Sequence, residues 1–312
     1  MDEEVTKHFI KISLSLSLFL LLLLLLLLLL LKIVIMVEKK MSLSTSMNAK
    51  IIGSGKESVV LAHGYGGDQS VWEKILPNLA QRYRVLVFDW SFSGAVNDLN
   101  LFDPEKYSSF DAFANDLISL MDEMNFTSSV LIGHSMSGMV GCIASIKRPD
   151  LFKKLILLVA SPRYLNTEDY EGGFEKSDVE QLLLNMESNF KEWVPSFAGL
   201  VVDARDNVSV DKFGKMLGRM KPEVALSVAK TIFFCDQRDF LEKVVVPCTI
   251  IQTSNDVVVP VSVAHYMQKK IKGKTTLEIM EADGHFPQLT AHQLFLDVLD
   301  RVFGFDSEDK NL

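Results

Sequence analysis

Short apolar runs alternate with longer amphipathic segments along the first half of the chain. An apolar run of four to six residues between turns predicts a buried strand, and apolar residues at helical spacing predict an amphipathic helix. The predicted strands cover residues 49–52, 58–62, 84–89, 130–132 and 155–159, and the predicted helices cover residues 69–82, 111–124 and 136–146. This alternation predicts an α/β fold with a mostly parallel, doubly wound sheet.

The alternation stops after Val159. Residues 161–241 contain no clear strand but several helical runs, at residues 177–185, 187–197, 210–220 and 223–234. An insertion of this length is too long for a loop and predicts a helical subdomain that covers the carboxyl edge of the sheet. Two further strands at 248–252 and 276–280 and a last helix at 288–303 complete the domain, which we expect to span residues 47–305, followed by an acidic tail at 306–312.

The first forty residues differ from the remainder. Residues 12–31 carry no charge and include an unbroken run of leucines from Leu20, which is long enough to cross a bilayer as a helix. The basic flank after this run would leave the domain in the cytosol. However, alternating Ser and Leu followed by pure Leu is typical of a translated simple repeat, and Met41 or Met47 could serve as the start. We expect residues 1–40 to be an optional leader or a misassigned start, with a membrane anchor as the alternative.

Composition excludes several classes of function. The formal net charge is −8, and Lys and Arg form no run longer than a pair within the domain, which argues against nucleic acid as a partner. Cys142, Cys235 and Cys248 are far apart and set in apolar or amphipathic surroundings, which predicts reduced core thiols in a cytosolic protein. Their spacing fits neither a disulfide framework nor a metal site, and we expect no cofactor.

A candidate nucleophile lies between the predicted strand at 130–132 and the helix at 136–146. The segment Gly133-His134-Ser135-Met136-Ser137 leaves almost no side-chain bulk where the strand must turn sharply into the helix. This arrangement is typical of a nucleophile elbow, which presents the central serine above the sheet. The usual pattern ends in Gly, and Ser137 is small enough to replace it. A plain turn is the alternative.

The partners of Ser135 are expected in the loops after the two late strands. Asp256 follows the strand at 248–252, and His285 follows the strand at 276–280, in the order nucleophile, acid, histidine that this fold uses. His285 would take the proton of Ser135 as general base, and Asp256 would hold the imidazole in the required tautomer. Alternatively, Asp256 caps the helix that begins near Pro260, and His285 is a loop residue packed on Phe286.

Backbone N–H groups are expected to stabilise the oxyanion of the transition state. Tyr65 follows His63-Gly64 directly after a strand, and Met136 follows the nucleophile. Their N–H groups would converge on the oxyanion, each contributing about 3 kcal/mol. The alternative is that residues 63–67 form only a flexible turn.

Several segments together resemble a known family: residues 63–72, 133–137, 148–152, 160–164, 169–174 and 283–288. From about Met47 to Phe303 the chain resembles the plant strigolactone and karrikin receptor family of α/β-hydrolases, which has the bacterial stress regulator RsbQ as a relative. Residues 161–164 and 172–174 are the most specific to this group. Residues 89–94 and Met136 are most similar to the DWARF14-LIKE2 branch.

The resemblance implies a slow serine hydrolase that opens a butenolide ring. It implies the triad Ser135, Asp256 and His285, and a V-shaped lid of four helices inserted after the sixth strand. In receptor members the lid then recruits an F-box protein of a ubiquitin ligase and Clp-type repressors. The implied pocket for a small apolar lactone is lined by Tyr65, Tyr164, Phe174, Trp193, Phe197, Phe213, Phe233 and Val257. Aromatic residues at helical spacing also pack in cores, so about half of these are expected to contact ligand.

The chain departs from the receptor branches at two places. Trp90-Ser91-Phe92-Ser93 replaces a glycine-rich loop, and Tyr65 replaces a Phe. The resemblance therefore supports hydrolysis by this chain more strongly than a signalling role. The expected function is a cytoplasmic and nuclear lactone hydrolase of the receptor type, and the alternative is a general carboxylesterase for small esters without a receptor role. A membrane partner is expected only if the leader anchors the protein through residues 12–31.

Overall fold

The computed structural model describes residues 16, 18–29, 42–98 and 100–304. The chain divides into two units, Met1–Ser42 and Leu43–Leu312. In the first unit, residues 18–29 are helical and their leucine side chains are exposed. None of the helices in the described ranges combines the length and the apolar character that a membrane span requires. Most of the predicted leader and the whole tail at 306–312 lie outside the described residues, so their roles stay predictions.

The second unit is built on a seven-stranded sheet with the order β1-β3-β2-β4-β5-β6-β7. Only β1 is antiparallel to its neighbour, and the other strands are parallel. This confirms the predicted mostly parallel sheet. The strands are β1 Lys50–Ile52, β2 Glu57–Ala62, β3 Tyr83–Val87, β4 Ser129–His134, β5 Phe152–Leu158, β6 Cys248–Asn255 and β7 Thr275–Asp283.

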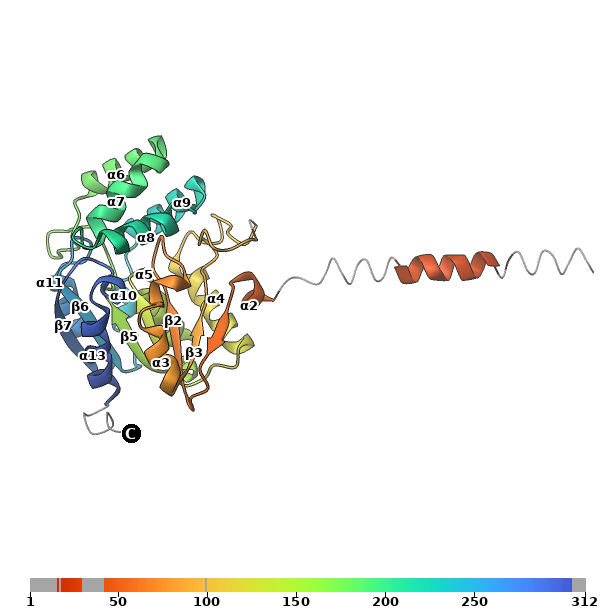
Figure 1. The fold of residues 1–312 in the computed structure, drawn as a ribbon, viewed down its shortest axis with the longest axis horizontal. Coiled ribbons are helices and arrows are strands. Elements are labelled where there is room, and N and C mark those ends of the chain that lie inside the picture. Colours follow the sequence, from red (N-terminus) through yellow and green to blue (C-terminus); the bar gives the residue numbers. More distant parts are fainter. Residues whose placement is uncertain (1–15, 17, 30–41, 99, 305–312) are drawn as a thin grey trace, which may run out of the picture. The chain divides into compact units, whose positions relative to one another are not determined.

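Helices connect the strands and cover both faces of the sheet (Figure 1). In this view α3 and α13 lie in front of the strands, whereas α4 and α5, which pack on each other, lie further back. The α-helices are α2 Leu43–Ser46, α3 Leu76–Arg82, α4 Phe110–Glu123, α5 Met136–Lys147, α6 Lys176–Ser188, α7 Phe190–Val201, α8 Asn207–Leu217, α9 Pro222–Phe233, α10 Arg238–Leu241, α11 Val261–Lys270, α12 Pro287–Thr290 and α13 His292–Phe303, with short 3₁₀ helices η1 Gln69–Trp72 and η2 Pro149–Leu151.

Two predicted helices are each divided into two. The segment predicted as one helix over 69–82 forms η1 and α3, because Pro77 lies at the start of α3, where a missing N–H is tolerated and a new helix begins. The segment predicted over 288–303 forms α12 and α13, which are separated at Ala291, where φ is −125° and ψ is 37°. In both places the apolar periodicity continues across the break, so the pattern alone could not reveal it.

The predicted helical insertion at 161–241 contains α6 to α9, which form the lid and gather over one end of the strands (Figure 1), and the short helix α10. Within it, α7 packs on α8 and α6 packs on α9. The insertion follows β5, the fifth strand of the described sheet, and not a sixth strand as the resemblance implied. Between β5 and α6 the only strand-like pairing in the described chain is two isolated bridges, Leu165 with Phe174 and Thr167 with Tyr170.

The apolar faces of the insertion and of the sheet form one continuous core. The central strand β4 is buried at every residue and pairs with β2 on one side and β5 on the other. Cys142, Cys235 and Cys248 are free and buried, as the sequence predicts. The central position of β4 fixes the place of the residue that follows it, Ser135.

Candidate active site

Ser135 lies in a sharp turn between β4 and α5. Its backbone has φ 56° and ψ −124°, a conformation that a non-glycine residue rarely adopts. The turn is so tight that position 133 has no room for a side chain: a Cβ on Gly133 would lie 2.6 Å from the carbonyl oxygen of Ser137. This geometry is that of a nucleophile elbow, which presents the serine hydroxyl at the carboxyl edge of the sheet.

A continuous relay of hydrogen bonds joins Ser135, His285 and Asp256. The distance from Ser135 Oγ to His285 Nε2 is 2.8 Å, and His285 Nδ1 lies 2.7 Å from Asp256 Oδ2. Because a carboxylate only accepts hydrogen bonds, Nδ1 carries the proton and Nε2 is left to accept from the serine hydroxyl. Asp256 follows β6 and His285 follows β7, and the parallel pairing of these strands brings both loops to the edge that Ser135 occupies.

Asp256 uses its two carboxylate oxygens for different purposes. Oδ2 accepts from His285, whereas Oδ1 accepts from the backbone N–H groups of Val258 and Val259 at 2.8 and 3.2 Å. The side chain is fully buried. The residue that precedes α11 as its N-cap is Pro260, so Asp256 orders the turn before that helix and does not cap the helix itself. The turn holds the carboxylate in one orientation toward the imidazole.

The two predicted oxyanion donors flank the nucleophile. Met136 is the first residue of α5, so its N–H has no acceptor within the helix. The N–H of Tyr65 has no backbone acceptor within the described residues. A Cβ added to Gly64 would lie 3.0 Å from Ser135 Cβ, so the loop that carries Tyr65 runs in contact with the nucleophile. Both N–H groups are therefore available near Ser135, and their role as oxyanion donors stays a prediction.

A largely apolar cavity of about 410 Å³, open solvent included, lies between the lid and the relay. Five of the eight predicted pocket residues line this cavity. The lining residues are Tyr65, His134, Ser135, Tyr164, Phe197, Val201, Phe213, Ile232, Phe233, Val258, His285 and Phe286.

The other three predicted pocket residues lie outside this lining. Trp193 stacks on Phe197 with ring centroids 4.5 Å apart, and Phe174 packs edge-on against Phe233 at 5.5 Å, so both lie behind residues that line the cavity. Val257 is 53% exposed, and its neighbour Val258 lines the cavity in its place. The N–H groups of Val258 and Val259 donate hydrogen bonds to Asp256 Oδ1 and fold this loop into a turn. In this turn Val258 faces the cavity and Val257 faces solvent.

Val201, Ile232 and Phe286 line the cavity but were not predicted. Val201 lies four residues after Phe197 in α7, and residues four apart share one face of a helix. Phe286 follows the predicted base directly. The position of each residue relative to a predicted site residue was therefore the available signal, although the same spacing also applies to Trp193, which does not line the cavity. No comparable signal distinguished Ile232 from the other apolar residues of α9.

His134, which the sequence assigned no role, forms a hydrogen bond with the backbone of His285. Its side chain is fully buried, and its Nε2 lies 2.7 Å from the backbone carbonyl oxygen of His285. Burial lowers the pKa of His134 well below its ordinary value, with the nearby His285 as a smaller cause. His134 is therefore neutral, and it donates its Nε2 proton to that carbonyl. The two residues are separated by 151 positions, so only the fold reveals the contact.

Two tyrosines border the cavity with neutral hydroxyl groups. Burial raises the pKa of Tyr65 well above its ordinary value, and it also raises the pKa of Tyr164. The Tyr164 hydroxyl lies 3.4 Å from Ser135 Oγ, which makes it at most a weak partner of the nucleophile. The Tyr65 hydroxyl donates to the carbonyl oxygen of Ala225 in α9 at 3.1 Å. Tyr65 therefore connects the loop beside the nucleophile to the lid.

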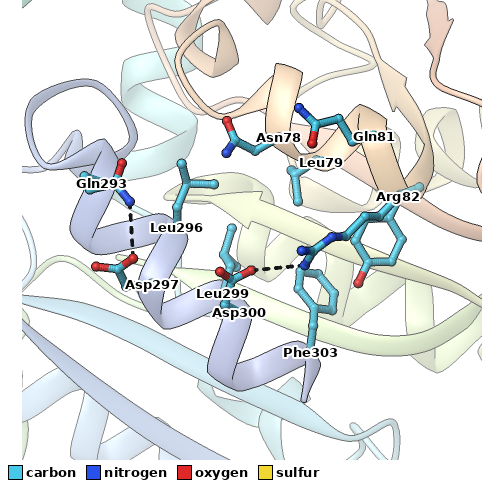
Figure 2. A pocket seen from close by; sticks show the side chains of 11 residues that line it. Asn78, Leu79, Gln81, Arg82, Gln293, Leu296, Asp297, Leu299, Asp300 and Phe303 are labelled. Carbon is cyan, nitrogen blue, oxygen red and sulfur yellow. Dashed lines mark hydrogen bonds and ion pairs between the residues drawn. The ribbon is translucent and has the colours of Figure 1, made fainter. Parts of the chain in front are cut away.

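A larger cavity of about 720 Å³, open solvent included, lies between α3 and α13 (Figure 2). It is lined mainly by polar side chains, including an Arg82 to Asp300 ion pair at 3.7 Å and a hydrogen bond from Gln293 to Asp297. It shares no residue with the relay and contains no serine, histidine or cysteine. The smaller apolar cavity under the lid is therefore the candidate active site. In the described parts of the chain, no cluster of three or more His, Cys, Asp or Glu could hold a metal ion.

An elbow serine, a histidine and a buried carboxylate at the carboxyl edge of a mostly parallel sheet define an α/β-hydrolase, and the sequence model of the alpha/beta hydrolase fold matches residues 57–291. The karrikin insensitive 2 receptor IA of Petunia hybrida is 46% identical over 85% of this chain and 96% of its own length. The strigolactone esterase D14 of Arabidopsis thaliana is 44% identical over 79% of this chain and 92% of its own.

A solved hydrolase from Oleispira antarctica has a TM-score of 0.81 and 32% identity, covering 85% of this chain and 97% of its own. The chain belongs to the α/β-hydrolase family, and within it to the group that contains these karrikin and strigolactone receptors and esterases. This confirms the resemblance drawn from the sequence. The protein is a hydrolase of the esterase type.

Proposed function

We propose that the protein hydrolyses a small apolar lactone of the butenolide type through Ser135, and that this slow reaction serves a receptor role. The observation that carries the proposal is the unbroken relay from Ser135 Oγ to His285 and Asp256, with distances of 2.8 and 2.7 Å, beneath a lid lined by aromatic side chains. The names of the relatives, karrikin receptors and strigolactone esterases, support the class of ligand.

The reaction follows from the positions of the three side chains. Ser135 Oγ attacks the carbonyl carbon of the lactone while its proton passes to His285 Nε2. The oxyanion accepts hydrogen bonds from the N–H groups of Tyr65 and Met136. When the ring C–O bond breaks, His285 returns the proton to the leaving oxygen. Water, activated by the same imidazole, then releases the opened product from Ser135.

The cavity suits a ligand with few polar atoms. Apart from the relay, its lining consists of aromatic and aliphatic side chains, His134 and two tyrosine hydroxyl groups. Burial of a small ring against such a surface stabilises the complex by about 25 cal/mol per Å² of apolar area. A highly charged substrate would lose its hydration without finding a partner.

The receptor role includes partners that bind after the lid has responded to ligand. By its family, the protein would recruit an F-box protein of a ubiquitin ligase and Clp-type repressors in the cytoplasm and nucleus. The alternative is a general carboxylesterase without partners. A butenolide ester distinguishes them: a receptor shows few turnovers, a ligand-dependent shift of the melting temperature and capture of an F-box protein, whereas an esterase shows many turnovers and no capture.

Replacing the nucleophile tests the chemistry directly. Ser135→Ala should lower kcat by up to about 10⁶-fold if the relay acts as a unit. Ser145→Ala is a matched control, since Ser145 is a buried serine of α5, the helix that follows Ser135, and its hydroxyl donates to the Cys142 carbonyl. Full activity in Ser135→Ala would refute the proposed function.

Ligand binding can be followed separately by tryptophan fluorescence. Trp193 stacks on Phe197, which lines the cavity, so a bound lactone should change the emission of Trp193. The signal should persist in Ser135→Ala, which binds without hydrolysis, and disappear in Trp193→Phe. A titration with strigolactone-like and karrikin-like compounds would then identify the preferred ligand.

A further inference from the structure

The carbonyl oxygen of His63 accepts two hydrogen bonds from side chains far away in the sequence. Ser137 Oγ donates to it at 2.5 Å and Trp90 Nε1 at 2.9 Å. Trp90 Nε1 also lies 2.9 Å from Ser137 Oγ, so the three groups form a closed triangle. All three residues have no exposed surface. Buried hydrogen bonds of this kind are protected from competition by water and hold their partners in one arrangement.

The ring of His63 extends the same network. Its Nε2 accepts from the backbone N–H of Trp90 at 3.1 Å, so the proton must lie on Nδ1, which donates to the carbonyl oxygen of Gly64 at 2.8 Å. Burial lowers the pKa of His63, which keeps the ring neutral as this pattern requires. Both carbonyl groups of the His63-Gly64 segment are therefore fixed by hydrogen bonds.

The hydrogen bonds to these two carbonyl groups fix the peptide groups on both sides of Gly64. The peptide group that contains the Gly64 carbonyl also contains the N–H of Tyr65, and a peptide group is planar. A hydrogen bond to the Gly64 oxygen thus orients the Tyr65 N–H, which points to the opposite side. Ser137 lies next to Met136, which carries the second donor. The hydroxyl of Ser137 consequently connects the two segments that supply the oxyanion donors.

We propose that Ser137 and Trp90 are positioning residues that fix the spacing of the two oxyanion donors through the carbonyl oxygen of His63. This inference rests on the proposed function, since it concerns the same reaction. It gives the fifth residue of the elbow a task that glycine cannot perform, because glycine has no hydroxyl to donate. It also assigns a role to Trp90, one of the residues at which the chain departs from the receptor branches.

The test compares kcat with KM in Ser137→Ala, using p-nitrophenyl acetate as substrate. Oxyanion donors act in the transition state and not in substrate binding, so kcat should fall about 10- to 100-fold, a part of the effect of losing a donor, while KM changes less than about threefold. A small boronic acid, which forms a tetrahedral adduct with Ser135, should bind more weakly by a similar factor. Trp90→Phe removes the indole N–H and should act in the same direction.

The structure offers controls for a purely structural effect. Ser137→Ala leaves the His63 carbonyl bonded to Trp90, so the variant should fold with a melting temperature close to that of the wild type. Ser145→Ala loses an equivalent buried hydroxyl on α5 and should keep kcat within about twofold. Ser137→Ala combined with Trp90→Phe should lose less than the product of the two single effects, because both act on one carbonyl.

The outcome separates this inference from the proposed function. If Ser135→Ala is inactive while Ser137→Ala and Trp90→Phe both keep wild-type kcat and boronic acid affinity, the positioning role is wrong and the proposed function stands. An equal loss of kcat in Ser145→Ala would also overturn the positioning role. If the wild type itself does not hydrolyse the ester through Ser135, the proposed function fails first.

Discussion

Replacing Asp256 by Asn should separate catalysis from folding. The asparagine keeps an oxygen for the N–H groups of Val258 and Val259, which the aspartate binds at 2.8 and 3.2 Å. Its NH₂ group then faces His285 Nδ1, where a carboxylate oxygen lies at 2.7 Å in the wild type. A donor in that position favours the tautomer with the proton on Nε2, which cannot accept the proton of Ser135.

The expected loss is large for catalysis and small for stability. Reversal of the tautomer should lower kcat about 10⁴-fold, as in other serine triads, which corresponds to about 5 kcal/mol of transition-state free energy. The free energy of unfolding should change by about 1 kcal/mol or less, because the turn keeps its acceptor. Asp256→Ala should be as inactive and also less stable by about 2–4 kcal/mol, since it leaves several buried donors unsatisfied.

The assay combines steady-state hydrolysis of p-nitrophenyl acetate with thermal and urea unfolding. Asp206→Asn is a matched control, because Asp206 accepts hydrogen bonds from the N–H and hydroxyl of Ser209 at the start of α8 but contacts no histidine. The control should retain kcat within about twofold. An Asp256→Asn variant that keeps kcat within tenfold of the wild type would refute the role assigned to the carboxylate.

Three further outcomes follow from the structure. His134→Phe removes the donor to the His285 carbonyl and should lower the free energy of unfolding by about 1–3 kcal/mol in urea titrations; an unchanged midpoint would contradict the contact. Burial lowers the pKa of His63 and His134 in the folded state, so the unfolded chain binds more protons below about pH 6.5. The free energy of unfolding should therefore be highest above that pH and fall by up to about 1.4 kcal/mol per pH unit for each histidine as the pH decreases toward the folded-state pKa values. Thermal melts from about pH 7.5 to about pH 5 test this, and pH-independent melting would refute it. Tyr65→Phe removes the bond to Ala225 and should speed ligand association up to about tenfold in stopped-flow fluorescence, whereas an unchanged rate would show that this bond does not restrain the lid.

The proximity of Ser135, Asp256 and His285 could be predicted from sequence because it depends on the order of the strands in the sheet. Parallel strands end at one edge of the sheet, so residues that follow β4, β6 and β7 must meet there whatever their side chains are. The elbow required small residues at a strand-to-helix junction, which the sequence displays directly. The meeting of the three loops follows from the order of the apolar runs, and the elbow follows from a local group of small residues.

The cavity lining could not be predicted in the same way because it depends on side-chain packing between the lid and the sheet. Trp193 and Phe197 are four residues apart on one face of α7, and only the position of the neighbouring helices decides which ring reaches the cavity. Val258 lines the cavity in place of the predicted Val257 because of the hydrogen bonds that Asp256 Oδ1 accepts in this loop. The network of His63, Trp90 and Ser137 joins three segments and has no local signal.

The central position of β4 has a consequence for how such proteins can diversify. A strand paired on both sides cannot shift without breaking two ladders, so Ser135 stays at a fixed point of the fold. The side chains that α7 to α9 contribute to the cavity are aromatic or aliphatic, and their packing tolerates substitutions of similar volume. New ligand preferences can therefore arise by exchange of residues in α7 to α9 while the chemical step is inherited unchanged.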